Sequence, residues 1–123
     1  MRDRILNFGL TRFPKCTESG QVIKVKGEIK EWYQEKPYTE GWYMELADVY
    51  IASTHCFMRF GNVLCKCLVD QIEERPDFMT VYEFVERKME INEARQWKGN
   101  RHVKKVIKRI NYKTGAIIEE VIK

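Results

Sequence analysis

The first candidate for chemistry is the basic segment 97–113, which concentrates positive charge. No acid interrupts its seven basic residues, which are Lys98, Arg101, Lys104, Lys105, Lys108, Arg109 and Lys113. Such a concentration of charge attracts phosphate or another anion. The guanidinium groups of Arg101 and Arg109 can each donate two hydrogen bonds to a phosphate, and Lys105 adds a point charge. The sequence equally allows a solvated segment whose lysines only keep the protein in solution.

Three polar residues on a predicted helix form the second candidate. The helix is predicted over residues 77–98, and its apolar face consists of Val81, Phe84, Val85, Met89 and Ile91. Lys88, Asn92 and Arg95 fall within the same arc, where a polar group needs a partner or water. The pattern predicts a pocket between helix and sheet, in which Asn92 both donates to and accepts from a base or ribose edge. Tyr82 lies at the rim of this face. The alternative is that the last turns extend beyond the sheet and are hydrated.

Arg59 belongs to a third candidate surface, on the outer face of a predicted strand. His55 and Phe57 share that face. An aromatic ring between cationic or titratable groups is typical of surfaces on which single-stranded nucleic acids stack. An ordinary exposed strand face explains the pattern better, but Arg59 stays among the candidate ligand-binding residues.

Catalysis and metal binding find little support in the sequence. It contains no P-loop, no G-x-S-x-G or H-E-x-x-H motif, and no paired carboxylate on a short strand. Cys65 and Cys67, with His55 and Cys56, could be proposed as a zinc site. Their spacing is unusual for zinc, and small thiols lining the core explain it better. We therefore expect no catalytic residue, no metal and no cofactor.

The pattern along the chain predicts an α+β fold, with an antiparallel sheet of about four to six strands packed against one amphipathic helix. Alternating and continuous apolar runs indicate strands over residues 21–33, 42–52, 54–60 and 63–70. Gly61-Asn62 joins the last two as a predicted two-residue hairpin turn. Before them, the first twenty residues read as irregular, with room for a short edge strand over residues 5–13.

The C-terminal segment is predicted to form a second hairpin. Residues 100–112 and 116–122 flank Gly115, which suits the turn. The apolar spacing of 100–112 also fits a helix, and the hairpin is favoured. The whole chain is then one domain, residues 1–123, with the sheet over 21–70, the helix over 77–98, and the basic arm and hairpin over 99–122.

The composition points to a small globular protein of the cytoplasm. The four cysteines, Cys16, Cys56, Cys65 and Cys67, are expected to be free thiols in a reducing compartment. No apolar run approaches the roughly 20 residues of a membrane helix, and the N-terminal residues do not resemble a signal peptide. A cytoplasmic location follows, in a host bacterium if the chain is encoded by a phage.

The order of elements resembles that of the phage anti-Thoeris sponge proteins. The residues that carry the comparison are Asn92 on the helix, the aromatic Tyr82, and Arg109 in the basic arm. The resemblance implies sequestration of a cyclic ADP-ribose isomer, which silences a bacterial immune signal. It also implies equilibrium capture with no bond broken, and a homodimer or larger homo-oligomer that buries the ligand between subunits.

The function favoured by the sequence is therefore non-catalytic binding of a small phosphorylated nucleotide. A single-stranded nucleic-acid-binding module is the first alternative, and it predicts a steep salt dependence. A small inhibitor of a host protein is the second. The candidate ligand-binding residues are Arg59, Tyr82, Asn92, Arg95, Arg101, Lys105 and Arg109.

Overall fold

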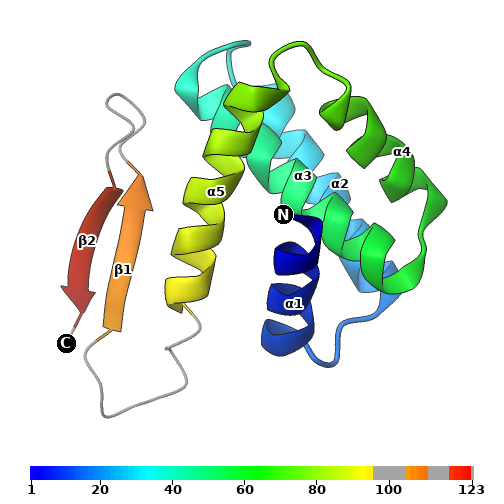
Figure 1. The fold of residues 1–123 in the computed structure, drawn as a ribbon, viewed down its shortest axis with the longest axis horizontal. Coiled ribbons are helices and arrows are strands. Elements are labelled where there is room, and N and C mark those ends of the chain that lie inside the picture. Colours follow the sequence, from blue (N-terminus) through cyan, green and yellow to red (C-terminus); the bar gives the residue numbers. More distant parts are fainter. Residues whose placement is uncertain (96–104, 111–116, 123) are drawn as a thin grey trace.

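The computed structural model describes residues 1–95 with their side chains and the backbone of residues 105–110 and 117–122. Five helices precede a two-stranded antiparallel hairpin (Figure 1). The helices are α1 (Arg2–Arg12), α2 (Glu18–Gln34), α3 (Glu40–Phe60), α4 (Val63–Glu73) and α5 (Phe78–Arg95). The strands are β1 (Lys105–Ile110) and β2 (Ile117–Ile122).

Helix α3 is the centre of the fold, since α1, α2, α4 and α5 all pack against it. A helix that is apolar on every side is stable only when neighbours cover it. The main core joins α3 to α1, α4 and α5 through Ile5, Met44, Leu46, Val49, Tyr50, Val69, Val81, Val85 and Met89. A smaller cluster joins α3 to α2 and α4 through Val25, Ala52, Cys56 and Cys65.

The predicted sheet over residues 21–70 is wrong, because that region forms α2, α3 and α4. Side-chain caps start the first two of these helices. The hydroxyl oxygen of Thr17 accepts from the backbone N–H of Gly20 at 3.1 Å, and that of Thr39 accepts from Trp42 at 3.2 Å. Such caps satisfy N–H groups that have no partner within the helix. The α+β fold with one helix against an antiparallel sheet is thereby replaced by a five-helix arrangement.

Gly61-Asn62 is a junction between two helices and not the predicted hairpin turn. Gly61 has φ 67° and ψ 24°, the left-handed conformation that ends many helices, and its N–H donates to the Phe57 carbonyl at 2.8 Å. The side-chain oxygen of Asn62 accepts from the Cys65 N–H at 2.9 Å and starts α4. The same two residue types serve hairpin turns and helix caps, so the dipeptide alone does not separate the two structures.

The first residues of the chain differ from the predicted structure, whereas α5 and the C-terminal strands lie close to it. The first residues form α1, where the sequence suggests irregular structure or a short edge strand. Helix α5 begins at Phe78, close to the predicted start at residue 77. In the C-terminal segment β1 pairs with β2, with Lys105 opposite Ile122 and Ile110 opposite Ile117. Figure 1 shows β1 lying beside α5.

Gly9 is required by the close approach of α1 to α3. A Cβ atom at this position would lie 2.5 Å from two ring atoms of the buried His55. We expect Gly9→Ala to destabilise the protein by about 1–3 kcal/mol, because overpacking costs more than the helix propensity gained. Urea denaturation measures this free energy of unfolding.

Gly27→Ala is the matched control for this substitution. Gly27 lies within α2, and a Cβ atom there would meet no atom within 4 Å. We expect this variant to be more stable than the wild type by up to about 1 kcal/mol. If both alanines stabilise the protein equally, α1 does not approach α3 as closely as described.

Candidate functional site

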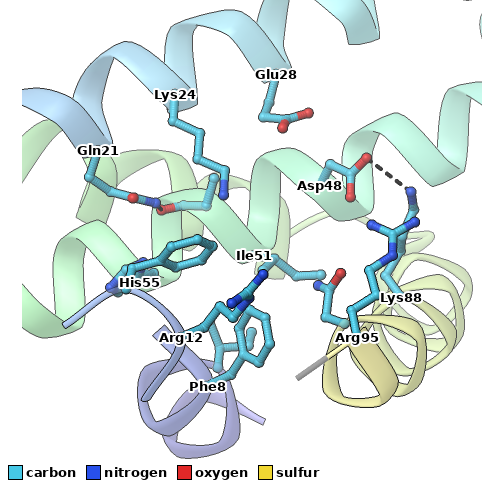
Figure 2. A pocket seen from close by; sticks show the side chains of 14 residues that line it. Phe8, Arg12, Gln21, Lys24, Glu28, Asp48, Ile51, His55, Lys88 and Arg95 are labelled. Carbon is cyan, nitrogen blue, oxygen red and sulfur yellow. Dashed lines mark hydrogen bonds and ion pairs between the residues drawn. The ribbon is translucent and has the colours of Figure 1, made fainter. Parts of the chain in front are cut away.

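A cavity of about 330 Å³ lies among α1, α2, α3 and α5. Its volume is in the range of small-molecule sites. The lining combines charged and polar side chains with apolar and aromatic ones, and consists of Ile5, Phe8, Arg12, Phe13, Gln21, Lys24, Glu28, Asp48, Ile51, Ala52, His55, Lys88, Asn92 and Arg95. Figure 2 shows these side chains converging from four helices.

Four cationic side chains reach the cavity. The ammonium group of Lys88 pairs with a carboxylate oxygen of Asp48 at 3.2 Å, the contact dashed in Figure 2. Arg12, Lys24 and Arg95 form no ion pair with any residue of the part that the structure describes. Their charges are thus available to a ligand, and guanidinium and ammonium groups are suited to phosphate.

Carboxylates from two helices gather at the edge of this cavity. Glu28 and Glu31 are one turn apart on α2, and Glu45 and Asp48 are one turn apart on α3. Residues three apart share a helix face, and α2 packs against α3, so the two acidic faces meet. One ligand atom each of Glu28, Glu31 and Glu45 lies within 4.8 Å of the others. We call Glu28, Glu31, Glu45 and Asp48 the carboxylate cluster.

The carboxylate cluster is electrostatically unfavourable without a cation. Burial and the neighbouring Asp48 raise the pKa of Glu28 and of Glu45 to about 7. Burial also raises the pKa of Asp48, against the opposing effect of Lys88. One oxygen of Glu28 and one of Glu45 are shielded from solvent and have no hydrogen-bond partner. Several carboxylate oxygens in one place are the ligands that Mg²⁺ and Ca²⁺ prefer.

The other end of the cavity is built by His55, which is held by Arg59. The Arg59 guanidinium donates to the carbonyls of Phe13 at 2.8 Å and Pro14 at 2.9 Å, and it lies 3.3 Å from Nε2 of His55. Burial, with Arg59 and Lys24 nearby, lowers the pKa of His55 to about 4. The imidazole is therefore neutral at physiological pH.

The structure brings together some of the candidate ligand-binding residues and separates others. Asn92 and Arg95 line the cavity together with Lys88, although this cavity lies between helices and not between a helix and a sheet. Tyr82 lies at a different, open hollow beside Tyr50 and Glu73. Arg59 binds backbone carbonyls and does not line the cavity.

The basic arm is described only in part. Lys105 and Arg109 are in β1, opposite Ile122 and Ile118 of β2. The structure gives their backbone positions alone. Arg101 lies outside the described residues, so the predicted phosphate contacts of the arm remain a prediction.

Sequence reasoning missed the carboxylate cluster entirely. Residues 21–33 and 42–52 were expected to be strands, on which positions three apart point to opposite faces. On helices the same spacing places Glu28 with Glu31, and Glu45 with Asp48, on shared faces. Two acidic pairs spaced by three residues were the signal that could have found the site.

The cysteines are free thiols in the structure. Cys56 and Cys65 are buried together in the smaller cluster, which confirms the expectation that they line the core. Cys67 is exposed, which corrects the expectation that it lines the core.

No protein-family model, curated protein or solved structure matches this chain. Across residues 1–95 and the two described strands, no helix combines the length and the apolar character needed to cross a membrane.

The raised pKa of Glu28 predicts a pH-dependent stability. Between pH 4.5, the ordinary value for a glutamate, and about pH 7, the folded protein binds more protons at this residue than the unfolded chain. The free energy of unfolding therefore decreases as the pH rises through that window, because the folded protein must give up a proton that it binds more tightly than the unfolded chain does. We expect Glu28→Gln to raise Tm at pH 8 by on the order of a few °C and to change it little at pH 5. Thermal unfolding at both pH values, without divalent cations, is the measurement.

Glu83→Gln serves as the control, because Glu83 is exposed on α5 and lies outside the carboxylate cluster. Its effect should be equally small at pH 5 and pH 8. His55 titrates with the opposite sign, but it is present in every variant and cancels in the comparison. An equal effect of Glu28→Gln at both pH values would contradict the raised pKa of Glu28.

Proposed function

We propose that the protein binds a nucleoside triphosphate together with a divalent cation and hydrolyses one of its phosphoanhydride bonds. One observation supports this proposal above the others. Glu28 belongs both to the carboxylate cluster and to the wall of the basic cavity, as does Asp48. A cation held by the cluster would therefore lie beside a phosphate held by the basic side chains.

Each group has a distinct part in this proposal. Glu28, Glu31 and Glu45 supply oxygen ligands for the cation, since their ligand atoms already lie within 4.8 Å of one another. Lys24 and Arg95 neutralise phosphate oxygens. Lys88 favours the ionised form of the buried Asp48, against the effect of burial, and fixes its position through their ion pair.

The reaction requires only water as co-substrate. The oxygen of a water molecule attacks a phosphorus atom, a new P–O bond forms, and the bond from that phosphorus to its bridging oxygen breaks. When the α phosphorus is attacked, the bridging oxygen leaves with the electron pair as part of pyrophosphate. When the γ phosphorus is attacked, it leaves as part of the nucleoside diphosphate, and the attacked group is released as phosphate. A carboxylate of the cluster accepts the proton released by the water. A bound divalent cation would lower the pKa of the water and offset the charge of the phosphates.

Capture without bond breaking, the function favoured by the sequence, is the second candidate. It would use the same cavity and the same cationic side chains. Asn92 on the cavity wall supports capture as well as it supports hydrolysis. The two candidates differ only in whether the bound nucleotide is turned over, and so one experiment separates them.

The experiment incubates the protein with ATP, CTP, ITP or UTP and MgCl₂, and it follows the products by ³¹P NMR and anion-exchange chromatography. We expect release of phosphate or pyrophosphate that EDTA abolishes. Glu45→Gln should lower the rate by at least about a hundredfold, because even residues that only orient metal ligands cost 10–100-fold. Glu83→Gln, which removes an exposed acid of α5, should leave the rate unchanged.

Other outcomes identify the other functions. Tight one-to-one binding of a nucleotide or of cyclic ADP-ribose without turnover would favour capture. Binding of a single-stranded oligonucleotide with a steep dependence on salt would favour a nucleic-acid module. If neither hydrolysis nor nucleotide binding is detected with MgCl₂ present, the proposed function is wrong.

A further inference from the structure

The cavity has two chemically different ends, and His55 marks the one that lies away from the carboxylate cluster. Asp48 and His55 are seven residues apart on α3, so they share a face two turns apart, about 10 Å along the helix axis. Figure 2 shows His55 at the opposite end of the cavity from Lys88. If the phosphates lie at the Asp48 end, as the proposed function requires, the base of the nucleotide reaches the His55 end.

The surroundings of His55 suit a flat, weakly polar group. The ring of Phe13 lies nearly parallel to the imidazole, with centroids 6.4 Å apart and 24° between the planes. Phe8, Ile51 and Ala52 also line the cavity. Gln21 lies beside His55 (Figure 2), and the Lys24 ammonium lies 4.6 Å from the centroid of the Phe13 ring. Aromatic and aliphatic side chains of this kind bind the faces of a planar ring and carry no preference for one base over another.

The hydrogen-bonding state of His55 is fixed by its neighbour. A guanidinium can only donate, so Arg59, 3.3 Å from Nε2, requires this nitrogen to be an acceptor. The ring is buried, with 4% of its surface exposed, and neutral, with a pKa near 4. Its single proton must then be on Nδ1. Among the residues that the structure describes, no hydrogen bond to Nδ1 is found, and Nδ1 is not one of the atoms that are fully shielded from solvent without a partner.

We infer that His55 is a specificity-determining residue, whose Nδ1–H donates to a keto oxygen of the nucleobase bound at this end of the cavity. This inference rests on the proposed function. A fixed donor favours a base that presents a keto oxygen and disfavours one that presents an amino group at the same edge. Hypoxanthine and uracil belong to the first class, and adenine and cytosine belong to the second.

The test compares pairs of nucleotides that differ at this group. The apparent Kd of the full chain, with MgCl₂ present, is measured by calorimetry for ITP against ATP and for UTP against CTP. We expect the keto member to bind about tenfold to a hundredfold more tightly in at least one pair, since a mismatch leaves a buried donor without a partner. The ratio should be the same at pH 6 and pH 8, because His55 stays neutral throughout.

His55→Phe should abolish this preference, because it keeps an aromatic ring and removes the donor. Thr54→Val is the control, since Thr54 is the buried neighbour on α3 and does not line the cavity. It should leave the ratio unchanged. If His55→Phe does not fold, the wild-type ratios still decide.

The failures of the two proposals can be told apart. Equal affinities within both pairs, or preference for ATP and CTP, would overturn the role of His55 and leave nucleotide binding intact. Absence of binding for all four nucleotides would instead overturn the proposed function.

Discussion

The packing of α2 against α3 is the contact on which the candidate site depends. It holds Glu28 and Glu31 close to Glu45 and Asp48, although carboxylates at such distances repel one another. The apolar contacts that offset this repulsion lie along the same pair of helices and include Val25, Ile29 and Ala52. Lys88, from α5, forms an ion pair with only one of these four carboxylates, Asp48. The core thus maintains a local excess of negative charge, which a bound cation would relieve.

Basic residues divide into two roles that their identities do not reveal. Arg59 donates hydrogen bonds to the carbonyls of Phe13 and Pro14, and these bonds hold the end of α1 against α3. Arg12 and Arg95 reach the same region but bind no acid within the described residues, which leaves them for a ligand. Whether an arginine holds the fold together or is left for a ligand depends on which backbone carbonyls lie within its reach, and only the fold determines that.

The sequence predicted the parts of the fold in which local pattern and tertiary environment agree. Helix α5 is the clearest case, because its five predicted apolar residues are the buried ones. The pattern failed for α3, since a helix covered on every side shows no 3.6-residue period and looks like a two-sided strand. It failed for α2 because Val25 and Ile29, four residues apart, fit both periods. Ile23, which the strand prediction placed with them, is 69% exposed.

The same ambiguity explains what could be predicted of the site. Lys88, Asn92 and Arg95 were found together because the period of α5 was correct, and all three line the cavity. The acids of α2 and α3 lie together only if both segments are helices. Because the sequence pattern predicted strands there, it did not group these acids. His55 and Arg59 were placed on one strand face. On α3 they are one turn apart, which brings the guanidinium to the imidazole.

Helix α1 supplies one wall of the cavity, and two of its arginines attach it to other helices by ion pairs. Arg4 donates to Glu93 of α5 at 3.0 Å, and Arg2 donates to Glu73 of α4 at 3.1 Å. These pairs are partly exposed, so dissolved ions screen them, with a Debye length of about 8 Å at physiological ionic strength. The buried side chain of Ile5 is not subject to this screening. Dissolved ions therefore act on only part of the attachment of the wall that carries Phe8 and Arg12, and the contact of Ile5 with the core keeps this wall in place when the ion pairs are screened.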